Sequence, residues 1–516
     1  MAASINPEKF MAKLLDLLSK AKDLTTTEGE AVRNIETNLQ RVKKEDFLAR
    51  VKLFDQTVLK QFTAVERRLG KIILPDETPN PDINATKEAL DLIDKDVQKI
   101  IDDLSLLKEC MPSPERISES HFHRFKPDQS GLAQKMSEDW SQLDLENRID
   151  ESNAIAKIRR TYDDLENLEL KMCFLSFSIF PDGSKIKKRP LIYWWIGEGF
   201  IKSTPEKTAE EVGEEIFEKL ITRGFINGTY SNASSRAVVI DCTIHPWIRR
   251  MLISLASKAG LFNFGSRGMS TCRRACLVFD PTDTQGDAGL KVDDLLTVFN
   301  VNVLYLNLKK EWLSKLNKVA VLQLGQWQNS TKYHIELEDE GSLKGLRAQK
   351  HLKYLSFRGI SRITELPSSI FRLTSLEILD LRACHNLEKL PPDISSLKNL
   401  THLDLSECYL LEGMPKGLEK LSSLQVLKGF LIGSKKNTPC RPGELAKLTN
   451  LKRLSIHIGN EAVVEEKEFK NFKNILSLRR LKISWGVVSK KLKDKIEECM
   501  EFSFPPDLEK LDLQGI

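Results

Sequence analysis

Residues 373–396 read LTSLEILDLRACHNLEKLPPDISS, and residues 397–420 read LKNLTHLDLSECYLLEGMPKGLEK. The two stretches repeat each other with a period of 24, so that leucines, one cysteine and one proline recur at matching places. A fixed repeat of this length is the signature of a leucine-rich-repeat solenoid, in which each turn supplies one short strand and a looser return segment. One turn cannot bury its leucines alone, and neighbouring turns therefore stack around a continuous core.

The same pattern extends beyond these two turns in both directions. It is regular from Leu352, irregular but recognisable from Val303, and looser after Leu427. We therefore predict that residues 303–516 form leucine-rich repeats, with strand leucines such as Leu403 fully buried. Such a curved array suits protein recognition better than chemistry.

The strand residues that flank the core leucines are predicted to form a concave recognition face, because side chains alternate along a strand. Basic residues outnumber acidic ones there, and two aromatic residues offer anchors for a protein contact. The residues expected to bind a partner are Tyr354, Arg358, Arg382, Lys428, Phe430, Arg453, His457, Arg480 and Lys482. We expect a protein partner with an acidic patch; the alternative for any single position is a solvated surface charge.

Length and composition limit the number of domains and the class of protein. A chain of 516 residues has room for about three domains. A hydrophobic content of 41% and a charged content of 29% are typical of globular proteins. The net charge of +5 is mild and does not by itself indicate nucleic acid. No uncharged apolar run approaches the ~18 residues of a membrane-spanning helix, so no integral membrane segment is predicted.

The nine cysteines are scattered and include no CxxC pair, a pattern that favours a reduced, intracellular protein. Cys272 and Cys276 lie one helical turn apart without histidine partners, which argues against zinc, and no metal is predicted. Cys384 and Cys408 occupy the small-residue position of the repeat, where a thiol packs as a small hydrophobe.

Residues 1–110 are predicted to form a helical domain, because apolar residues recur there at the spacing of amphipathic helices. Two interpretations remain: a coiled-coil signalling module or an ordinary helical bundle. Residues 111–152 contain several prolines and little periodicity, and we interpret them as a linker.

Residues 153–265 are predicted to form a winged-helix domain, joined to the repeats by a connector at 266–302. Two helical patterns at 191–201 and 210–221 precede a β-branched run, and Pro246 suits the first turn of the next helix. The predicted architecture is multidomain, α and then α/β. A DNA-binding role would need a basic recognition helix, whereas residues 210–219 are acidic.

Residues 170–201, LKMCFLSFSIFPDGSKIKKRPLIYWWIGEGFI, resemble one particular segment. It is the winged helix of plant coiled-coil nucleotide-binding leucine-rich-repeat disease-resistance proteins. The resemblance extends to TYDDL at 161–165, to AEEVGEEIFEKLITRGFI at 209–226 and to the LPxxIxxLxxLxxLxLxxC pattern of the repeats. It covers the chain from about residue 150 onward. The N-terminal helices occupy the position of the coiled-coil domain in that family.

The family carries a nucleotide-binding switch with a phosphate loop of the form GxxxxGK[ST]. The single Gly-Lys pair in this chain is Gly70-Lys71, which lies in a helical run and is followed by Ile72. The predicted linker has some forty residues, far below the ~100–150 of a nucleotide-binding domain. We therefore expect a family member without the P-loop domain.

The resemblance also implies one remnant of a nucleotide site. A Met-His-Asp motif in the family places its histidine against the ADP phosphate, and Ile244, His245 and Pro246 stand at that place here. His245 is a candidate cofactor contact; the alternative is a histidine that begins a helix and holds no ligand. No cofactor is expected, and ADP binds only if the chain works as a switch.

The sequence shows no catalytic constellation such as HExxH or GxSxG, and we predict that the chain is not an enzyme. The resemblance implies a role in plant defence through protein contacts, as a sensor, adaptor or regulator. The implied partners are another immune receptor, a guarded host protein or a pathogen effector, with no nucleic acid. The alternatives are an ADP/ATP switch that borrows its nucleotide domain from another chain, and a truncated, non-functional product. The expected location is the cytoplasm, with the inner face of the plasma membrane as the second location.

Overall fold

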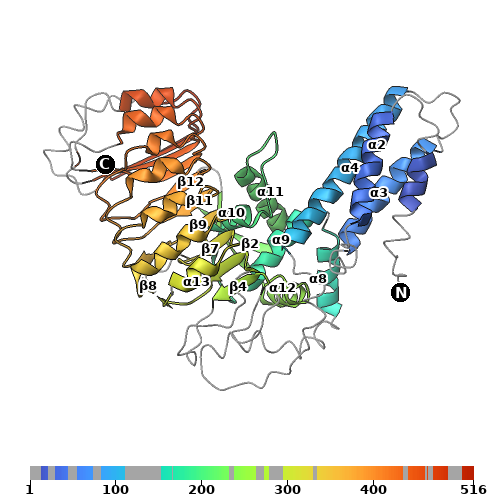
Figure 1. Ribbon diagram of the computed structural model, residues 1–516, viewed down its shortest axis with the longest axis horizontal. Coiled ribbons are helices and arrows are strands. Elements are labelled where there is room, and N and C mark those ends of the chain that lie inside the picture. Colours follow the sequence, from blue (N-terminus) through green and yellow to red (C-terminus); the bar gives the residue numbers. More distant parts are fainter. Residues whose placement is uncertain are drawn as a thin grey trace, which may run out of the picture.

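A computed structural model describes residues 13–20, 29–44, 55–73, 83–110, 153–165, 167–231, 238–262, 272–277, 294–308, 310–328, 334–433, 440–459, 462, 469–485 and 503–515. Figure 1 shows three parts in chain order: N-terminal helices in blue, a mixed part in green, and stacked repeats in yellow to red. The predicted linker at 111–152 lies outside the described residues.

The described N-terminal part contains a helical stretch at 13–20 and the helices α2 (Gly29–Lys44), α3 (Asp55–Ile73) and α4 (Ile83–Cys110), and α4 packs against α2 and α3. Their apolar residues fall every third or fourth position, so each helix buries one stripe. On α4 that stripe includes Leu90, Ile93 and Val97, all fully buried. The predicted helical character of this region agrees with these helices, while the coiled-coil signalling role stays a prediction. No described helix is long and apolar enough to span a bilayer.

The middle part combines helices with a three-stranded antiparallel sheet of order β1-β3-β2. Its elements are α8 (Asn153–Asp163), α9 (Leu168–Leu175), η2 (Ser176–Ile179), β1 (Ile186–Lys187), α10 (Lys188–Glu198), α11 (Ala209–Thr222), β2 (Ile226–Ser231), β3 (Val238–Ile244) and α12 (Pro246–Lys258). Helices followed by a small strand pair are what the sequence predicted for a winged helix.

Local sequence signals explain where its helices begin and end. Thr208 and Glu211 form a reciprocal capping box that starts α11. Gly199, with φ of 74°, ends α10 in the left-handed conformation that glycine adopts without strain. The start of α11 and the end of the short helix α10 are thus both set by local sequence.

The repeats form a ten-stranded sheet of order β16-β15-β14-β13-β12-β11-β9-β7-β5-β4, and every neighbouring pair is parallel. The strands are β4 (Arg274–Leu277), β5 (Thr297–Asn300), β7 (Val321–Gln323), β9 (Tyr354–Ser356), β11 (Ile378–Asp380), β12 (His402–Asp404), β13 (Val426–Ile432), β14 (Arg453–Ile458), β15 (Arg480–Trp485) and β16 (Lys510–Gln514). Leu379 pairs with Leu355 and with Leu403, so the repeat leucines align in register. Leu403 is fully buried, which confirms the predicted core.

The sheet begins earlier than the sequence predicted. Strands β4 and β5 lie inside the predicted connector at 266–302; β4 pairs with β5, and β5 pairs with β7. They lack the leucine spacing of the later turns, with Ala275 and Val298 as their inward residues, and that is why the pattern did not reveal them.

Short helical segments connect several pairs of successive strands between β6 (Tyr305–Leu306) and β15 in the part of the chain that the structure describes. They are α13 (Lys310–Lys315), η4 (Glu340–Ala348), η5 (Ser368–Arg372), η6 (Pro392–Ser396), η7 (Leu418–Lys420), η8 (Pro442–Lys447) and η9 (Phe469–Asn474). A small parallel sheet of β10 (Ile360–Ser361), β8 (Ile335–Leu337) and β6 (Tyr305–Leu306) lies beside the first turns. The thiols of Cys384 and Cys408 donate to the carbonyl oxygens of Phe357 and Leu381 in the preceding turn, so the small-residue position of the repeat is a packing position.

Candidate functional site

The concave face consists of the strand side chains that point away from the leucine core. Helix α10 of the middle part packs against β7 and β9 on this face, and Figure 1 shows it between the green elements and the strands of the repeats. Val321, Tyr354 and Ile378 of the face belong to the same hydrophobic core as the winged helix. The winged helix and the first part of the concave face therefore form one packed unit.

The C-terminal end of α10 is attached by a buried ion pair. Glu198 accepts from the Arg274 guanidinium at 2.8 Å, and both side chains are 1% exposed. The same carboxylate accepts from the Thr297 hydroxyl at 2.7 Å and from the Trp194 indole at 2.8 Å. Fixed donors of this kind are what a buried carboxylate requires.

One turn of α10 lies so close to the sheet that it requires a glycine. A Cβ on Gly197 would lie 2.5 Å from the Tyr354 Cβ and 3.1 Å from a Val321 methyl carbon. Glycine inside a helix normally costs stability relative to alanine, and the close approach explains its presence here.

The N-terminal half of α10 contacts the middle strands through Tyr193. Its ring lies 4.6 Å from the His402 ring on β12, and the Lys428 ammonium lies 5.8 Å from its centroid. Lys428 also pairs with Asp404 at 2.9 Å. These contacts extend the covered area to β12 and β13.

Glu210, at the start of α11, connects the winged helix to two strands at once. Its Oε2 lies 3.4 Å from the His402 Nε2, and its Oε1 accepts from the guanidinium of Arg453 on β14. Burial would raise the pKa of this carboxyl, but the hydrogen bond with His402 and the charge of Arg453 outweigh it and hold the pKa below its usual value. Glu210 is therefore an ionised anchor between the two parts.

These contacts correct the predicted recognition face. Tyr354 is 2% exposed and donates its hydroxyl to Gln323 at 2.8 Å, and Arg358 is 6% exposed. Neither is available as an anchor for another protein, because α10 and the neighbouring strands cover this part of the face. The sequence pattern could not show that the face already has an occupant from the same chain.

Phe430 is a second correction. It is fully buried in the leucine core and not on the concave face. The pairing of β13 with β14 shifts register between Leu427 and Phe430, next to Gly429 with its φ of 73°. An irregularity of this kind reverses which side chains face the core, and regular alternation therefore assigned Phe430 to the wrong side.

Other predicted cations have partners within the chain. Arg382 donates to Glu407 at 2.6 Å, Lys428 pairs with Asp404, and Arg453 pairs with Glu210. The excess of basic residues along this part of the face is thus largely neutralised internally.

The remaining predicted residues lie on β14 and β15, beyond the contact of Arg453 with Glu210 of the winged helix. We call this part of the concave face its open end. Arg480 is exposed, and Lys482 and His457 are half-buried. The register places Arg480 between Arg453 and Lys510 on the neighbouring strands. Burial, with the nearby charges of Arg453 and Arg189, lowers the pKa of Arg480, as expected where cations gather. This end of the face is electropositive.

His245 lies apart from the concave face, at the start of α12. Its side chain is exposed, and its Nδ1 accepts from the Trp247 amide at 3.2 Å. Capping of this kind satisfies one of the free amides of a helix N-terminus. This capping role explains the histidine without requiring a bound ligand, and a phosphate contact at His245 remains a prediction.

Two family models match the chain. One, described as a disease resistance protein winged helix domain, matches residues 179–252, and one described as a leucine-rich repeat region matches residues 299–516. The first lies inside the predicted winged-helix domain, and the second begins within β5, in agreement with the earlier start of the sheet.

The relatives with similar sequences are also named as disease resistance proteins. Disease resistance RPP13-like protein 4 of Arabidopsis thaliana is 29% identical over 66% of this chain and 38% of its own length. Disease resistance protein RFL1 of the same plant is 28% identical over 45% of this chain and 23% of its own. The chain thus spans well under two thirds of these relatives. Among solved structures, the repeat ectodomain of the Arabidopsis receptor kinase HAESA aligns at 18% identity over 43% of this chain and 38% of that one, with a TM-score of 0.26.

Proposed function

We propose that this chain, which belongs to the plant nucleotide-binding leucine-rich-repeat family of disease-resistance proteins, acts in defence by binding another protein through the open end of its concave face. The partner carries an acidic patch, and the chain acts as a sensor, adaptor or regulator. The observation that carries this proposal is the contrast along one sheet face: the winged helix covers the first strands, while Arg480, Lys482 and His457 remain accessible.

The chemistry of the open end supports a partner with negative charge. Like charges on directly opposite strand positions destabilise a sheet, and Arg453, Arg480 and Lys510 stand in such a row. Glu210 neutralises the first of them. An acidic surface would complete the row and would attract the partner over a distance, which raises the association rate at low salt.

The proposal places no nucleotide switch in this chain. The sequence supports this with its missing phosphate loop, and the capping bond at His245 supplies the histidine with a structural role. Purified full chain should therefore show neither ADP nor ATP binding by calorimetry, and no rise in melting temperature with nucleotide. Micromolar ADP affinity that disappears in His245→Ala would instead establish the switch.

Proximity labelling in plant tissue tests the recognition surface. The fusion of the full chain should label a partner that the Arg480→Glu/Lys482→Glu variant fails to label. A control variant, Lys398→Glu/Lys473→Glu, makes the same charge change at exposed positions of the return segments and should label as well as the wild type. Surface changes of this kind alter the free energy of unfolding by less than about 0.5 kcal/mol, so lost labelling reports on binding. Undiminished labelling by the first variant would place the contact elsewhere.

A further inference from the structure

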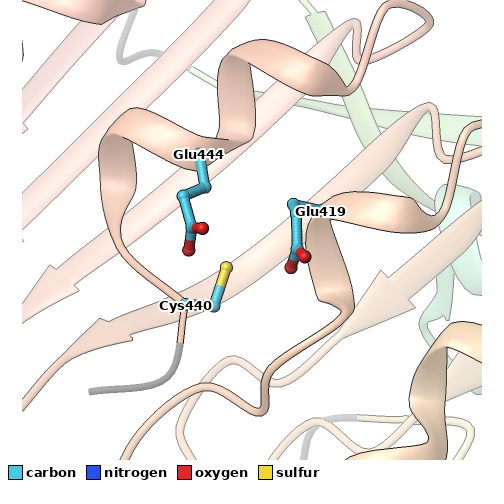
Figure 2. A group of neighbouring side chains, drawn as sticks. All are labelled: Glu419, Cys440 and Glu444. Carbon is cyan, nitrogen blue, oxygen red and sulfur yellow. The ribbon is translucent and has the colours of Figure 1, made fainter. Parts of the chain in front are cut away.

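Three side chains of metal-binding type meet on the return side of two neighbouring repeats. Glu419 lies in η7, Glu444 lies in η8, and Cys440 stands just before η8. Their ligand atoms all lie within 4.8 Å of one another. Figure 2 shows the Cys440 sulfur beneath the two carboxylates, with all three side chains directed towards the same space.

The cluster is shielded from water and held by the backbone. Cys440 is fully buried, Glu419 is 7% exposed, and Glu444 is half-buried. The Glu419 carboxylate accepts from the Gly417 amide at 2.9 Å, and the Glu444 carboxylate accepts from the Arg441 amide at 3.0 Å. The positions of both acids are therefore set before any ligand arrives.

Cys440 differs from the two cysteines of the regular repeats. Cys384 and Cys408 donate to a carbonyl oxygen of the preceding turn. No carbonyl oxygen among the described residues accepts the S–H of Cys440. Burial and the charges of Glu444 and Glu419 raise the pKa of this thiol. A neighbouring cation would reverse that balance and make the sulfur a ligand.

The two carboxylates of the cluster differ in their charged partners. Among the described residues, Glu419 forms no ion pair, and Lys447 approaches Glu444 at 3.8 Å with its own side chain 62% exposed. Burying a carboxylate without a compensating charge is costly. A cation between the two acids and the thiol would compensate the buried charge of Glu419.

We propose that Glu419, Cys440 and Glu444 bind a divalent cation of the zinc type. One sulfur and two carboxylate oxygens suit zinc, whereas calcium and magnesium prefer oxygen donors alone. Zinc bonds of about 2.3 Å to sulfur and about 2.0–2.2 Å to oxygen require ligand atoms about 3.3–3.7 Å apart, so the group closes by roughly 1 Å on binding. Three protein ligands leave a fourth position for water, and the ion joins two adjacent turns of the solenoid.

Calorimetry with the purified, chelator-treated full chain tests the site directly. One equivalent of Zn²⁺ should bind with release of a proton from the thiol, and binding should strengthen as the pH rises. Because loss of an outer-shell partner alone costs about 10–100-fold in metal affinity, Cys440→Ser and Glu419→Gln should each weaken binding more than about tenfold. Cys408→Ser, which changes another buried thiol of the solenoid, should leave it unchanged.

Cobalt supplies a second readout that does not depend on affinity. Co²⁺ bound at this site should show a sulfur-to-metal charge-transfer band that is present in Cys408→Ser and absent in Cys440→Ser. If Cys440→Ser does not fold, Glu444→Gln at the half-buried ligand should keep the band and lower the affinity. Cobalt binding without the sulfur band, or zinc affinity unchanged by all three ligand substitutions, would overturn the proposal.

Discussion

The two ends of one sheet face differ in what lies on them. At β7, β9 and β11 the outward residues Val321, Tyr354 and Ile378 are buried in a core shared with the winged helix. At β15 and β16 the equivalent Arg480 and Lys510 are exposed. The difference teaches that basic side chains on one repeat face differ in role: Arg453, beside the winged helix, binds its Glu210, whereas those beyond it are the ones that we propose contact another protein.

Glu198→Ala should have the largest effect on the packing of the winged helix against the concave face. The substitution removes the main partner of a buried Arg274, and breaking a buried ion pair on one side costs about 3–5 kcal/mol. Chemical denaturation of the full chain should show this loss in the transition that contains the repeats. Glu206→Ala, at an exposed position before α11, is the matched control and should change the free energy of unfolding by less than about 0.5 kcal/mol.

Leu403→Ala should have the next largest effect on stability, because Leu403 belongs to the leucine core that lies behind both ends of the concave face. Leu403 lies behind the covered strands and Leu481 lies behind the open ones, and both are buried. Each change to alanine should cost about 2–5 kcal/mol through lost burial and the cavity left behind, as measured by denaturant unfolding. A melting temperature unaffected by Leu403→Asp would mean that the repeat register is wrong.

Glu210→Gln should have a smaller effect, because Arg453 is partly accessible to water. Losing the charge should cost about 1.5–3 kcal/mol, the range for hydrogen bonds to charged groups. Glu218→Gln, at an exposed position of the same helix, is the control and should cost less.

The same pair also predicts a pH dependence with a definite sign. The folded-state pKa of Glu210 lies below its ordinary value of 4.5. Its contribution is therefore complete above that value and is lost as the pH falls below it. Wild-type stability should decline more steeply on acidification than that of Glu210→Gln; parallel curves would show that Glu210 is not the ionised anchor.

The spacing of the leucines was enough to predict the repeats and their core, and the helical patterns with the family resemblance of residues 170–201 predicted the position of the winged helix. It could not predict what covers the concave face, because Glu198 and Glu210 are distant in sequence from Arg274 and Arg453, to which they bind. One signal was present: Val321 and Ile378 are apolar on the side of the strand that normally faces solvent, as in strands buried on both faces.

Two further features escaped sequence reasoning for local reasons. The register shift in β13 depends on Gly429, where an added Cβ would lie 2.4 Å from the Leu405 backbone, so Phe430 turned into the core. The proposed ligands Glu419 and Cys440 come from different repeats, and neither a metal-ligand spacing nor a CxxC pair in the sequence indicated them.

The most direct test asks whether the winged helix covers one part of the concave face and leaves the other accessible. It uses two histidines that the repeat places on this face. His402 on β12 is 6% exposed beneath Tyr193, whereas His457 on β14 is half-buried at the open end. Diethyl pyrocarbonate treatment of the full chain, followed by mass spectrometry of each histidine peptide, compares their accessibility. We expect modification of His457 with little at His402, and faster modification of His402 in Glu198→Ala. Equal rates at the two histidines in the wild-type chain would contradict the account, because the winged helix would then not cover that part of the face.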